Sequence, residues 1–314
     1  MGKYLLENIH AQYPQAKLAI VVASRSKMIC DLFADYPWLE IIEVNRFSPR
    51  ALFSLHKNFR SSDLVVTQYT GKSGGRFSFW SKFVARGLAK HGGLVGFVDA
   101  SRWNKALYDV LLPVERNRAV VEHDREAVRA AHVPLALPFP VLHYKKDSTI
   151  LSRFELSAEA FIVVHLFAGN AGRGLHPDKK KELIAKLTER FPGVRLVLTG
   201  AAADREEALR IAKDTSATMI AGDISLQELM NIIAVSKAVV SVDTGVAHIA
   251  AHLSKKLFVL RTCIAANWWF PEQYGPNAPI EVFSCDSVCA DGHVFGGYPR
   301  CMNSIDITRL VASI

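Results

Sequence analysis

The 314-residue sequence has few cysteines, no long apolar run and no recognisable nucleic-acid-binding motif. Its five cysteines are too few and too scattered for the disulfide framework that stabilises small secreted proteins. No apolar run approaches the ~20 residues that a membrane-spanning helix needs, and no signal peptide opens the sequence. We therefore expect a globular protein of the cytoplasm, long enough to form two domains that each bury a core.

Acidic residues are also in short supply. The sequence has 30 Asp and Glu residues against 38 Lys and Arg residues, which gives a formal net charge of +8. An excess of positive charge indicates an anionic partner, but it does not choose among nucleic acid, a nucleotide, a phospholipid and a phosphorylated glycolipid. Because no nucleic-acid-binding motif accompanies the charge, we expect no nucleic-acid partner.

Three of the cysteines, Cys285, Cys289 and Cys301, lie near the C-terminus. A zinc site usually has four ligands, and His293 is the only nearby candidate for the fourth. A zinc site is therefore the alternative, and reduced structural cysteines are the expectation. We expect no metal ion and no cofactor.

Short β-branched runs alternate with helical apolar patterns along the whole chain, which is typical of doubly wound parallel sheets. In the first half the expected strands are Lys17–Ala23, Glu40–Val44, Leu64–Thr67 and Val95–Phe97. In the second half they are Phe161–Leu166, Val194–Leu198, Met219–Ala221, Val239–Val242 and Leu257–Leu260. Three prolines in the segment 130–144 predict a linker between the halves. Ser225 and Glu228 have the spacing of a helix-capping box.

The stretch from Val239 to His252 carries the most informative chemistry. A buried strand turns sharply into a helix at Asp243, Thr244 and Gly245, so that helix amides point at any anion above the strand end. Gly245 permits close backbone approach and Thr244 offers a hydroxyl. His248 lies about one turn further on, facing the same spot. The alternative is a capping aspartate followed by a histidine at the edge of the core.

Two more loops of the second half are expected at the same edge of the sheet. In the first, Gly169 and the loop around Asn170 free backbone amides for a pyrophosphate, and Arg173 can pair with phosphate oxygens. In the second, Glu206 can accept ribose hydroxyl groups. A flexible loop and a solvated helix N-terminus are the respective alternatives. The segment 70–75 lacks the spacing of a Walker phosphate loop.

The decapeptide from Val242 to Ala251 (VDTGVAHIAA) resembles the nucleotide-sugar motif of glycosyltransferase family 9, the bacterial heptosyltransferases. The segment 168–177 resembles the family's loop ending in Lys-x-Trp-Pro, with His176 at the Trp position and Gly174 where a lysine often stands. Arg173 is therefore the expected substitute cation. The stretch 199–207 resembles the family's Gly-x-Pro-x-Glu-Glu segment, and Cys301 to Ile305 resembles its Cys-Met-x-x-Ile tail.

The resemblance implies the GT-B architecture, in which two Rossmann-like doubly wound α/β domains face each other across a cleft. Residues 1–140 are then the acceptor-side domain and 141–300 the nucleotide-sugar-binding domain, with 301–314 a helix packing back on the N-terminal domain. The implied reaction is inverting transfer of a heptose-like sugar, from a nucleotide-diphosphate donor such as ADP-heptose to lipopolysaccharide core or a related surface glycan. The implied partners are that donor, an anionic glycolipid and the cytoplasmic face of the inner membrane.

Four cations of the first half are candidates to face the anionic acceptor, or to be merely solvated. They are Lys72, Arg76, Lys82 and Arg86. The first two are the stronger candidates.

The sequence departs from the family at its start. Family members open with a strand and a Gly-Asp loop, whose aspartate is the expected catalytic base, whereas this sequence starts within the following helix. We therefore identify no catalytic base and expect unpaired strand edges and a weaker N-terminal domain. One alternative is a non-catalytic protein that binds a nucleotide or a nucleotide sugar. A second is a nucleotide-sugar 2-epimerase of the same architecture.

Overall fold

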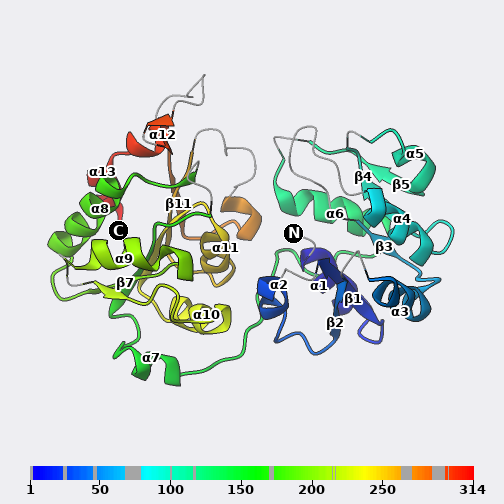
Figure 1. Ribbon diagram of the computed structural model, residues 1–314, viewed down its shortest axis with the longest axis horizontal. Coiled ribbons are helices and arrows are strands. Elements are labelled where there is room, and N and C mark those ends of the chain that lie inside the picture. The colour runs from blue at the N-terminus through cyan, green and yellow to red at the C-terminus, as the bar shows by residue number, and fades with distance from the viewer. Residues whose placement is uncertain are drawn as a thin grey trace. The chain divides into compact units, whose positions relative to one another are not determined.

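The chain divides into two compact units, Met1–Val141 and Leu142–Ile314, which are described here one at a time (Figure 1). The computed structural model describes residues 3–23, 27–44, 48–67, 79–99, 101–115, 118–169, 173–213, 215, 217–262, 271–284, 294–295 and 297–314.

Unit 1 contains two separate parallel sheets. In the first, β1 (Leu18–Ala23) pairs with β2 (Leu39–Val44), and Leu18 lies opposite Leu39. In the second, β4 (Leu94–Phe97) lies between β3 (Val65–Val66) and β5 (Val110–Leu112). Among the described residues no strand joins the two sheets, so β1 and β3 each have one unpaired edge.

The helices of unit 1 surround these sheets. They are α1 (Lys3–Gln12), α2 (Lys27–Leu32), α3 (Pro49–Phe59), α4 (Phe79–Leu88), α5 (Asn104–Leu107) and α6 (Val120–Ala130). α1 packs against α6 and also binds the proline-containing segment that follows α6. The Asn8 side-chain oxygen accepts hydrogen bonds from the backbone amides of Ala136 and Leu137, both at 2.9 Å. The first part of the predicted linker is therefore an ordered part of unit 1.

Unit 2 is built on one parallel sheet of six strands in the order β11-β10-β9-β6-β7-β8. The strands are β6 (Phe161–His165), β7 (Arg195–Leu198), β8 (Thr218–Met219), β9 (Ala238–Val242), β10 (Leu257–Leu260) and β11 (Ile280–Phe283). Every residue of β6, β9 and β10 is buried. This is why those strands are near-continuous β-branched and aromatic runs rather than alternating ones.

Helices on both faces cover this sheet (Figure 1). They are α8 (Pro177–Arg190), α9 (Arg205–Ala212), α10 (Leu226–Ala234), α11 (Gly245–His252) and α13 (Ile307–Ser313). Shorter elements are α7 (Thr149–Arg153), α12 (Arg300–Asn303), the 3-10 turns Ala202–Asp204 and Pro271–Tyr274, and the hairpin β12 (Val294–Phe295) with β13 (Tyr298–Pro299). The predicted capping box is confirmed: the Ser225 hydroxyl accepts from the Glu228 amide at 3.2 Å, and the Glu228 carboxylate accepts from the Ser225 amide at 2.6 Å.

The C-terminal segment, residues 301–314, belongs to unit 2, and its predicted packing on the N-terminal domain stays a prediction. Cys301, Met302, Ile307 and Leu310 are buried in the same core cluster as β6 and β9, and α13 packs against α8. The apolar face of α13 is thus fully used within unit 2. Cys301 is buried, whereas Cys285, Cys289 and His293 lie outside the described residues.

Candidate functional site

The sheet of unit 2 has a topological switch point between β6 and β9. From β6 the chain winds outward through β7 and β8, and it then returns to β9 on the other side and winds outward through β10 and β11. Ligands of open α/β sheets bind in the crevice at the carboxyl ends of the strands beside such a point. The loops that follow β6, β9 and β10 meet there, and they contain most of the predicted donor-binding residues.

Thr244 stands at the start of α11 with a hydroxyl that the fold does not use. Its backbone is extended (φ −140°, ψ −179°), and its side chain makes no capping hydrogen bond to the helix. Within the described part of the chain, the buried Thr244 Oγ1 has no hydrogen-bond partner at all. Leaving a buried hydroxyl unsatisfied costs about 1–3 kcal/mol, so a water molecule or a ligand that bonds to it would stabilise the site.

The space above the N-terminus of α11 is open. A Cβ atom placed on Gly245 would contact nothing within 4 Å, and the same holds for Gly169 in the loop after β6. Neither glycine is therefore required by packing inside the protein. Both leave room for a ligand to approach backbone amides closely, at the helix end where the peptide dipoles favour negative charge.

Asp243 connects this helix end to two guanidinium groups. Its backbone amide donates to the Leu260 carbonyl at 3.0 Å, which ties the end of β9 to the end of β10. Burial raises the pKa of the Asp243 carboxyl group, while the positive charges of Arg173 and Arg261 oppose that rise. The predicted pair Asp243 and Arg173 is thus brought together, with Arg261 beside them.

Arg261 was not identified from the sequence. It directly follows the buried strand β10, and its backbone amide donates to the Phe283 carbonyl at 2.9 Å. A cation placed right after a central strand was a usable signal, because the carboxyl ends of neighbouring parallel strands share one edge of the sheet.

His248 lies on the same side of α11 and is oriented by a tyrosine. Its Nδ1 is hydrogen-bonded to the Tyr274 hydroxyl, and its Nε2 is 4.0 Å from Asp243 Oδ1. Desolvation lowers the pKa of His248 and raises that of Tyr274, so both groups are neutral near pH 7. With the phenol as donor, the imidazole proton resides on Nε2 and faces Asp243. Tyr274 lies in the short 3-10 turn Pro271–Tyr274.

Two predicted donor-site residues remain, Asn170 and Glu206. Asn170 lies outside the described residues. Glu206 is in the first turn of α9 with its side chain 88% exposed, 3.8 Å from Arg210. In the described part of the chain, no hydrogen bond or ion pair joins Glu206 to Asp243 or Arg173. Its neighbour Glu207 instead accepts from the buried Lys180 at 2.8 Å.

The outcome differs among the four predicted acceptor-binding cations of unit 1. Lys72 and Arg76 lie outside the described residues. Lys82 is neither solvated nor available to a ligand, because its side chain is fully buried and its ammonium donates to both Asp99 oxygens, at 2.8 and 2.7 Å. Arg86 pairs with Asp109 at 2.6 Å.

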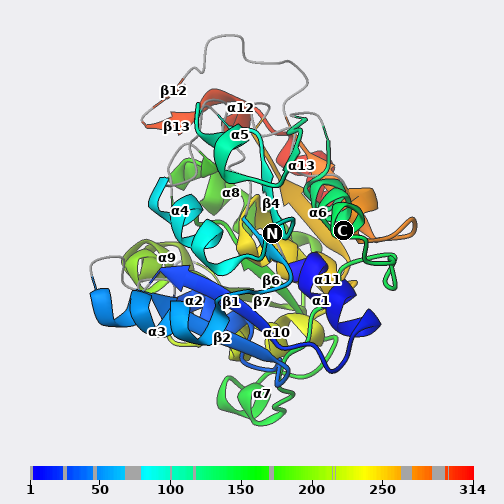
Figure 2. The ribbon, with the colours of Figure 1, turned by 90° about the vertical axis from the view of Figure 1, so that its right-hand side faces the viewer.

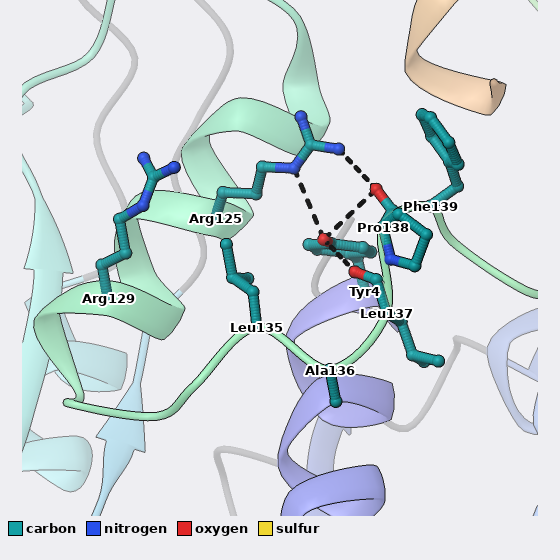
Figure 3. Close-up of a pocket in the computed structure, with 8 residues that line it drawn as sticks. All are labelled: Tyr4, Arg125, Arg129, Leu135, Ala136, Leu137, Pro138 and Phe139. Atoms are coloured by element: carbon teal, nitrogen blue, oxygen red, sulfur yellow. Dashed lines mark hydrogen bonds between the residues drawn. The ribbon is translucent and has the colours of Figure 1, made fainter. Parts of the chain in front are cut away.

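Unit 1 also has a hollow of about 370 Å³ between α1, α6 and the segment 135–139 (Figure 3). Arg125 reaches across it to the Tyr4 hydroxyl at 3.4 Å and to the Pro138 carbonyl. The two arginines that line it, Arg125 and Arg129, also pair with Glu122 and Glu126. Because its cations are engaged by internal partners, we assign this hollow to holding the proline-containing segment rather than to an anionic ligand.

Two further properties of the described residues bear on function. No group of three or more His, Cys, Asp or Glu side chains among them could hold a metal ion. No helix in the described part of the chain has the length and apolar character required to cross a bilayer.

The family model described as glycosyltransferase family 9 (heptosyltransferase) matches residues 78–260. Lipopolysaccharide heptosyltransferase 2 of Salmonella typhimurium is 31% identical over 183 residues, which make up 54% of this chain and 47% of that protein. The chain thus spans about half the length of the curated relatives it matches.

Solved structures show the same fold. The E. coli ADP-heptose lipopolysaccharide heptosyltransferase II aligns with a TM-score of 0.74 and 21% identity, covering 99% of this chain and 92% of that one. The E. coli heptosyltransferase WaaC with ADP aligns with a TM-score of 0.66 and 17% identity, covering 99% and 93%. These alignments confirm the predicted α/β fold of the GT-B type. Because the family match extends over more than half of the sequence, the chain belongs to glycosyltransferase family 9, the heptosyltransferases.

Proposed function

We propose that the chain transfers a heptose from ADP-heptose to lipopolysaccharide core with inversion at the anomeric carbon. The observation that carries the donor assignment is the buried, unpartnered hydroxyl of Thr244 at the N-terminus of α11. It stands beside open space at Gly245 and near two guanidinium groups. A diphosphate supplies the acceptor oxygens and the negative charge that this arrangement lacks.

Each residue of the cluster has a role in this proposal. Inverting transfer breaks the bond between the anomeric carbon and the diphosphate, so negative charge develops on the leaving group. The amides at the start of α11, the Thr244 hydroxyl, Arg173 and Arg261 stabilise that charge without a metal ion. Asp243 repels phosphate and instead accepts a hydroxyl group of the sugar or orients the loop. His248, in its neutral form, donates a hydrogen bond through its Nε2–H group.

Relatives support the choice of donor and acceptor. The matched Salmonella protein is named a lipopolysaccharide heptosyltransferase, and the E. coli structures carry ADP or ADP-heptose in their names. The acceptor class is lipid-anchored, so we place the reaction at the cytoplasmic face of the inner membrane. The alternative is a protein that binds the same nucleotide sugar without turnover, since the described residues offer no catalytic base that we can assign.

Calorimetric titration with ADP and with UDP tests the donor site directly. We expect ADP to bind and Thr244→Val to weaken it about tenfold or more, because a hydrogen bond to a charged group contributes about 1.5–3 kcal/mol. The melting temperature of Thr244→Val should be equal to or above the wild-type value, because the removed hydroxyl has no partner in the unliganded fold. Arg173→Ala should weaken ADP binding as well.

The matched controls are Thr188→Val and Arg190→Ala on α8, where the Thr188 hydroxyl bonds only to the Ile184 carbonyl at 2.9 Å. Both should bind ADP like the wild type. Failure of either nucleotide to bind the wild-type chain would remove the donor site. Binding of ADP without release of ADP from ADP-heptose, in the presence of a lipopolysaccharide core acceptor, would favour the non-catalytic alternative.

A further inference from the structure

The positive charge of the chain is concentrated in one segment. Residues 48–112 contain 10 of the 38 Lys and Arg residues but 3 of the 30 Asp and Glu residues. About a fifth of the chain therefore carries +7 of the net charge of +8, and the remaining residues are almost balanced. This segment forms α3, α4, α5 and the sheet β3-β4-β5 of unit 1.

The three acids of this segment are used internally. Asp99 binds the buried Lys82, Asp109 binds Arg86, and Asp63 binds Lys90. The described cations that remain have no ion pair in the described part of the chain and lie exposed on α3 and at the start of α5: Arg50, Lys57, Arg60, Arg102 and Lys105. Their charge is therefore not neutralised by the fold.

Large aromatic side chains are exposed on the same three helices. Phe53 on α3 is 71% exposed, Trp80 and Phe83 on α4 are 65% and 56% exposed, and Trp103 before α5 is 49% exposed. Trp80 and Phe83 contact each other edge to face, with ring centroids 6.3 Å apart. Aromatic residues of this size usually lie in the core of a soluble domain, so a group of them among unpaired cations indicates an interface.

The helices place these side chains on one outer side of unit 1. α4 lies between α3 and α5 in both views (Figures 1 and 2). On α4, Lys82 points inward to Asp99 and Asn104, so Trp80 and Phe83, turned away from it around the helix, point outward. A Cβ on Gly87 of α4 would lie 4.0 Å from the His56 ring of α3, which brings the two exposed faces together. We call this the α3–α5 surface.

We propose that the α3–α5 surface binds an anionic phospholipid bilayer, with its aromatic side chains at headgroup level and its unpaired cations on the lipid phosphates. Tryptophan and other large aromatics concentrate at the membrane–water interface, and each Lys or Arg near an anionic bilayer adds roughly fivefold to the binding constant. The inference extends the proposed function, because it supplies the contact with the membrane in which a lipid-linked acceptor resides.

A nucleic acid is the other polyanion to consider. Single strands are bound in a basic groove, where aromatic rings lie flat for bases to stack on them. The aromatic side chains here project from the outer faces of helices, and Trp80 and Phe83 meet at an interplanar angle of 87°. The arrangement therefore favours a bilayer, and an oligonucleotide serves as a probe in the test.

Cosedimentation with vesicles tests the proposal. The vesicles are phosphatidylcholine alone, or phosphatidylcholine with about one third phosphatidylglycerol. Wild-type protein should bind the anionic vesicles at least about twentyfold more tightly than the neutral ones, and high salt should reduce this difference. Arg102→Glu/Lys105→Glu should lower binding to anionic vesicles at least about twentyfold. Trp80→Ser/Phe83→Ser should lower binding about tenfold or more, because it removes the apolar contact.

Matched controls on unit 2 are Lys181→Glu/Lys213→Glu and Leu209→Ser, which change exposed residues of α8, α9 and the turn after α9. Both should bind vesicles like the wild type. Phe53→Ser on α3 replaces the aromatic double variant if thermal melting shows that the latter does not fold. Equal binding of wild type to both vesicle types, or equal binding by wild type and all surface variants, overturns the proposal. Binding of a single-stranded oligonucleotide without binding of vesicles also overturns it.

The ADP titration is independent of this result. Surface variants that lose vesicle binding but keep the wild-type affinity for ADP would support the α3–α5 surface. If the wild type binds ADP but does not bind vesicles, this inference alone is removed. Loss of ADP binding, with vesicle binding intact, would remove the donor site alone.

Discussion

The two units support their parallel sheets in different ways. Unit 2 joins six strands into one sheet, and the residues of its central strands are buried on both faces. The described residues of unit 1 divide five strands between two sheets, and Val21 in β1 is 47% exposed. Parallel strands need cover on both faces, and the central strands of unit 2 have it, whereas β1 of unit 1 is partly exposed.

Unit 1 compensates with polar connections over long sequence distances. Tyr4, Glu7 and Asn8 of α1 hold backbone groups of the segment 136–141, and Lys82 binds Asp99 and Asn104 across three elements. Hydrogen bonds to buried charges are costly to break, because the partner left behind remains desolvated. We therefore expect unit 1 to be sensitive to polar substitutions and unit 2 to apolar ones.

The largest effect is expected at the buried ion pair of unit 1. Asp99→Ala leaves the ammonium of the fully buried Lys82 without its carboxylate, which should reduce the free energy of unfolding of unit 1 by about 3–5 kcal/mol. The matched change in unit 2 is Asp223→Ala, because the side chains of Asp223 and of its partner Arg205 are 36% and 46% exposed, and it should cost less than half as much. Hydrogen exchange read by mass spectrometry assigns each loss to its unit. Equal losses would contradict the comparison.

The opposite ranking is expected for apolar truncation. Ile162→Ala in β6 removes a side chain that is completely buried, and should cost unit 2 about 2–5 kcal/mol. Ile20→Ala in β1 removes a partly exposed side chain at the margin of the small cluster around Phe33 and Tyr36, and should cost unit 1 about half of that. Urea unfolding followed by hydrogen exchange measures both, since two units need not unfold in one step. A larger loss for Ile20→Ala than for Ile162→Ala would contradict the expected difference between the two units.

Acid should weaken unit 2 through a buried histidine. His165 ends β6, its Nδ1 lies 3.0 Å from the Thr199 hydroxyl, and burial lowers its pKa from 6.5 to about 4. The unfolded chain therefore binds a proton between pH 6.5 and 4 that the folded chain does not. Above pH 6.5 the neutral histidine makes its full contribution to the free energy of unfolding of unit 2. About 3 kcal/mol of that contribution is lost as the pH falls to 4.

His165→Gln should flatten this pH dependence, measured as the unfolding midpoint of unit 2 in urea from pH 7 to 4. The counterpart in unit 1 is His123, whose Nε2 accepts from the Glu115 amide at 3.1 Å and whose pKa is also lowered by burial. His123→Gln should flatten the response of unit 1 alone. An unchanged slope in the His165 variant would show that another group controls the acid response.

Much of the fold follows from sequence periodicity, because buried parallel strands are short apolar runs between helices. All nine expected strands coincide with strands of the structure, give or take a few residues. Four strands of the described residues were not expected: β5, β11 and the two short strands of the hairpin, β12 and β13. β11 is Ile280–Phe283, a partly exposed sheet edge, so its sequence lacks the apolar run that identifies a central strand. The packing of α13 on α8 could not be predicted, because an amphipathic helix does not specify which core it covers.

Less of the candidate site follows from sequence. One motif indicates Asp243, Thr244, Gly245 and His248 together, because they lie within a single short stretch of the sequence. Arg261 and Tyr274 come from a strand end and a 3-10 turn, and only the sheet order brings them near Asp243 and His248. Charge in sequence also does not reveal burial: Lys82 looked like a surface cation and is an internal one.

Helix caps give the smallest contrast between the units, because they act locally whatever sheet lies beneath. Ser225 at the start of α10 forms a reciprocal capping box with Glu228, whereas Ser48 at the start of α3 accepts one hydrogen bond, from the Ala51 amide at 3.3 Å. Ser225→Ala should therefore cost about 1–2 kcal/mol and Ser48→Ala about 0.5–1 kcal/mol. Glu228→Gln, which keeps an acceptor oxygen, should lose little of the Ser225 contribution and separates the hydrogen bond from the charge. Urea unfolding of the three variants measures the differences, and a Ser48→Ala loss as large as that of Ser225→Ala would mean that the second bond of the box adds nothing to α10.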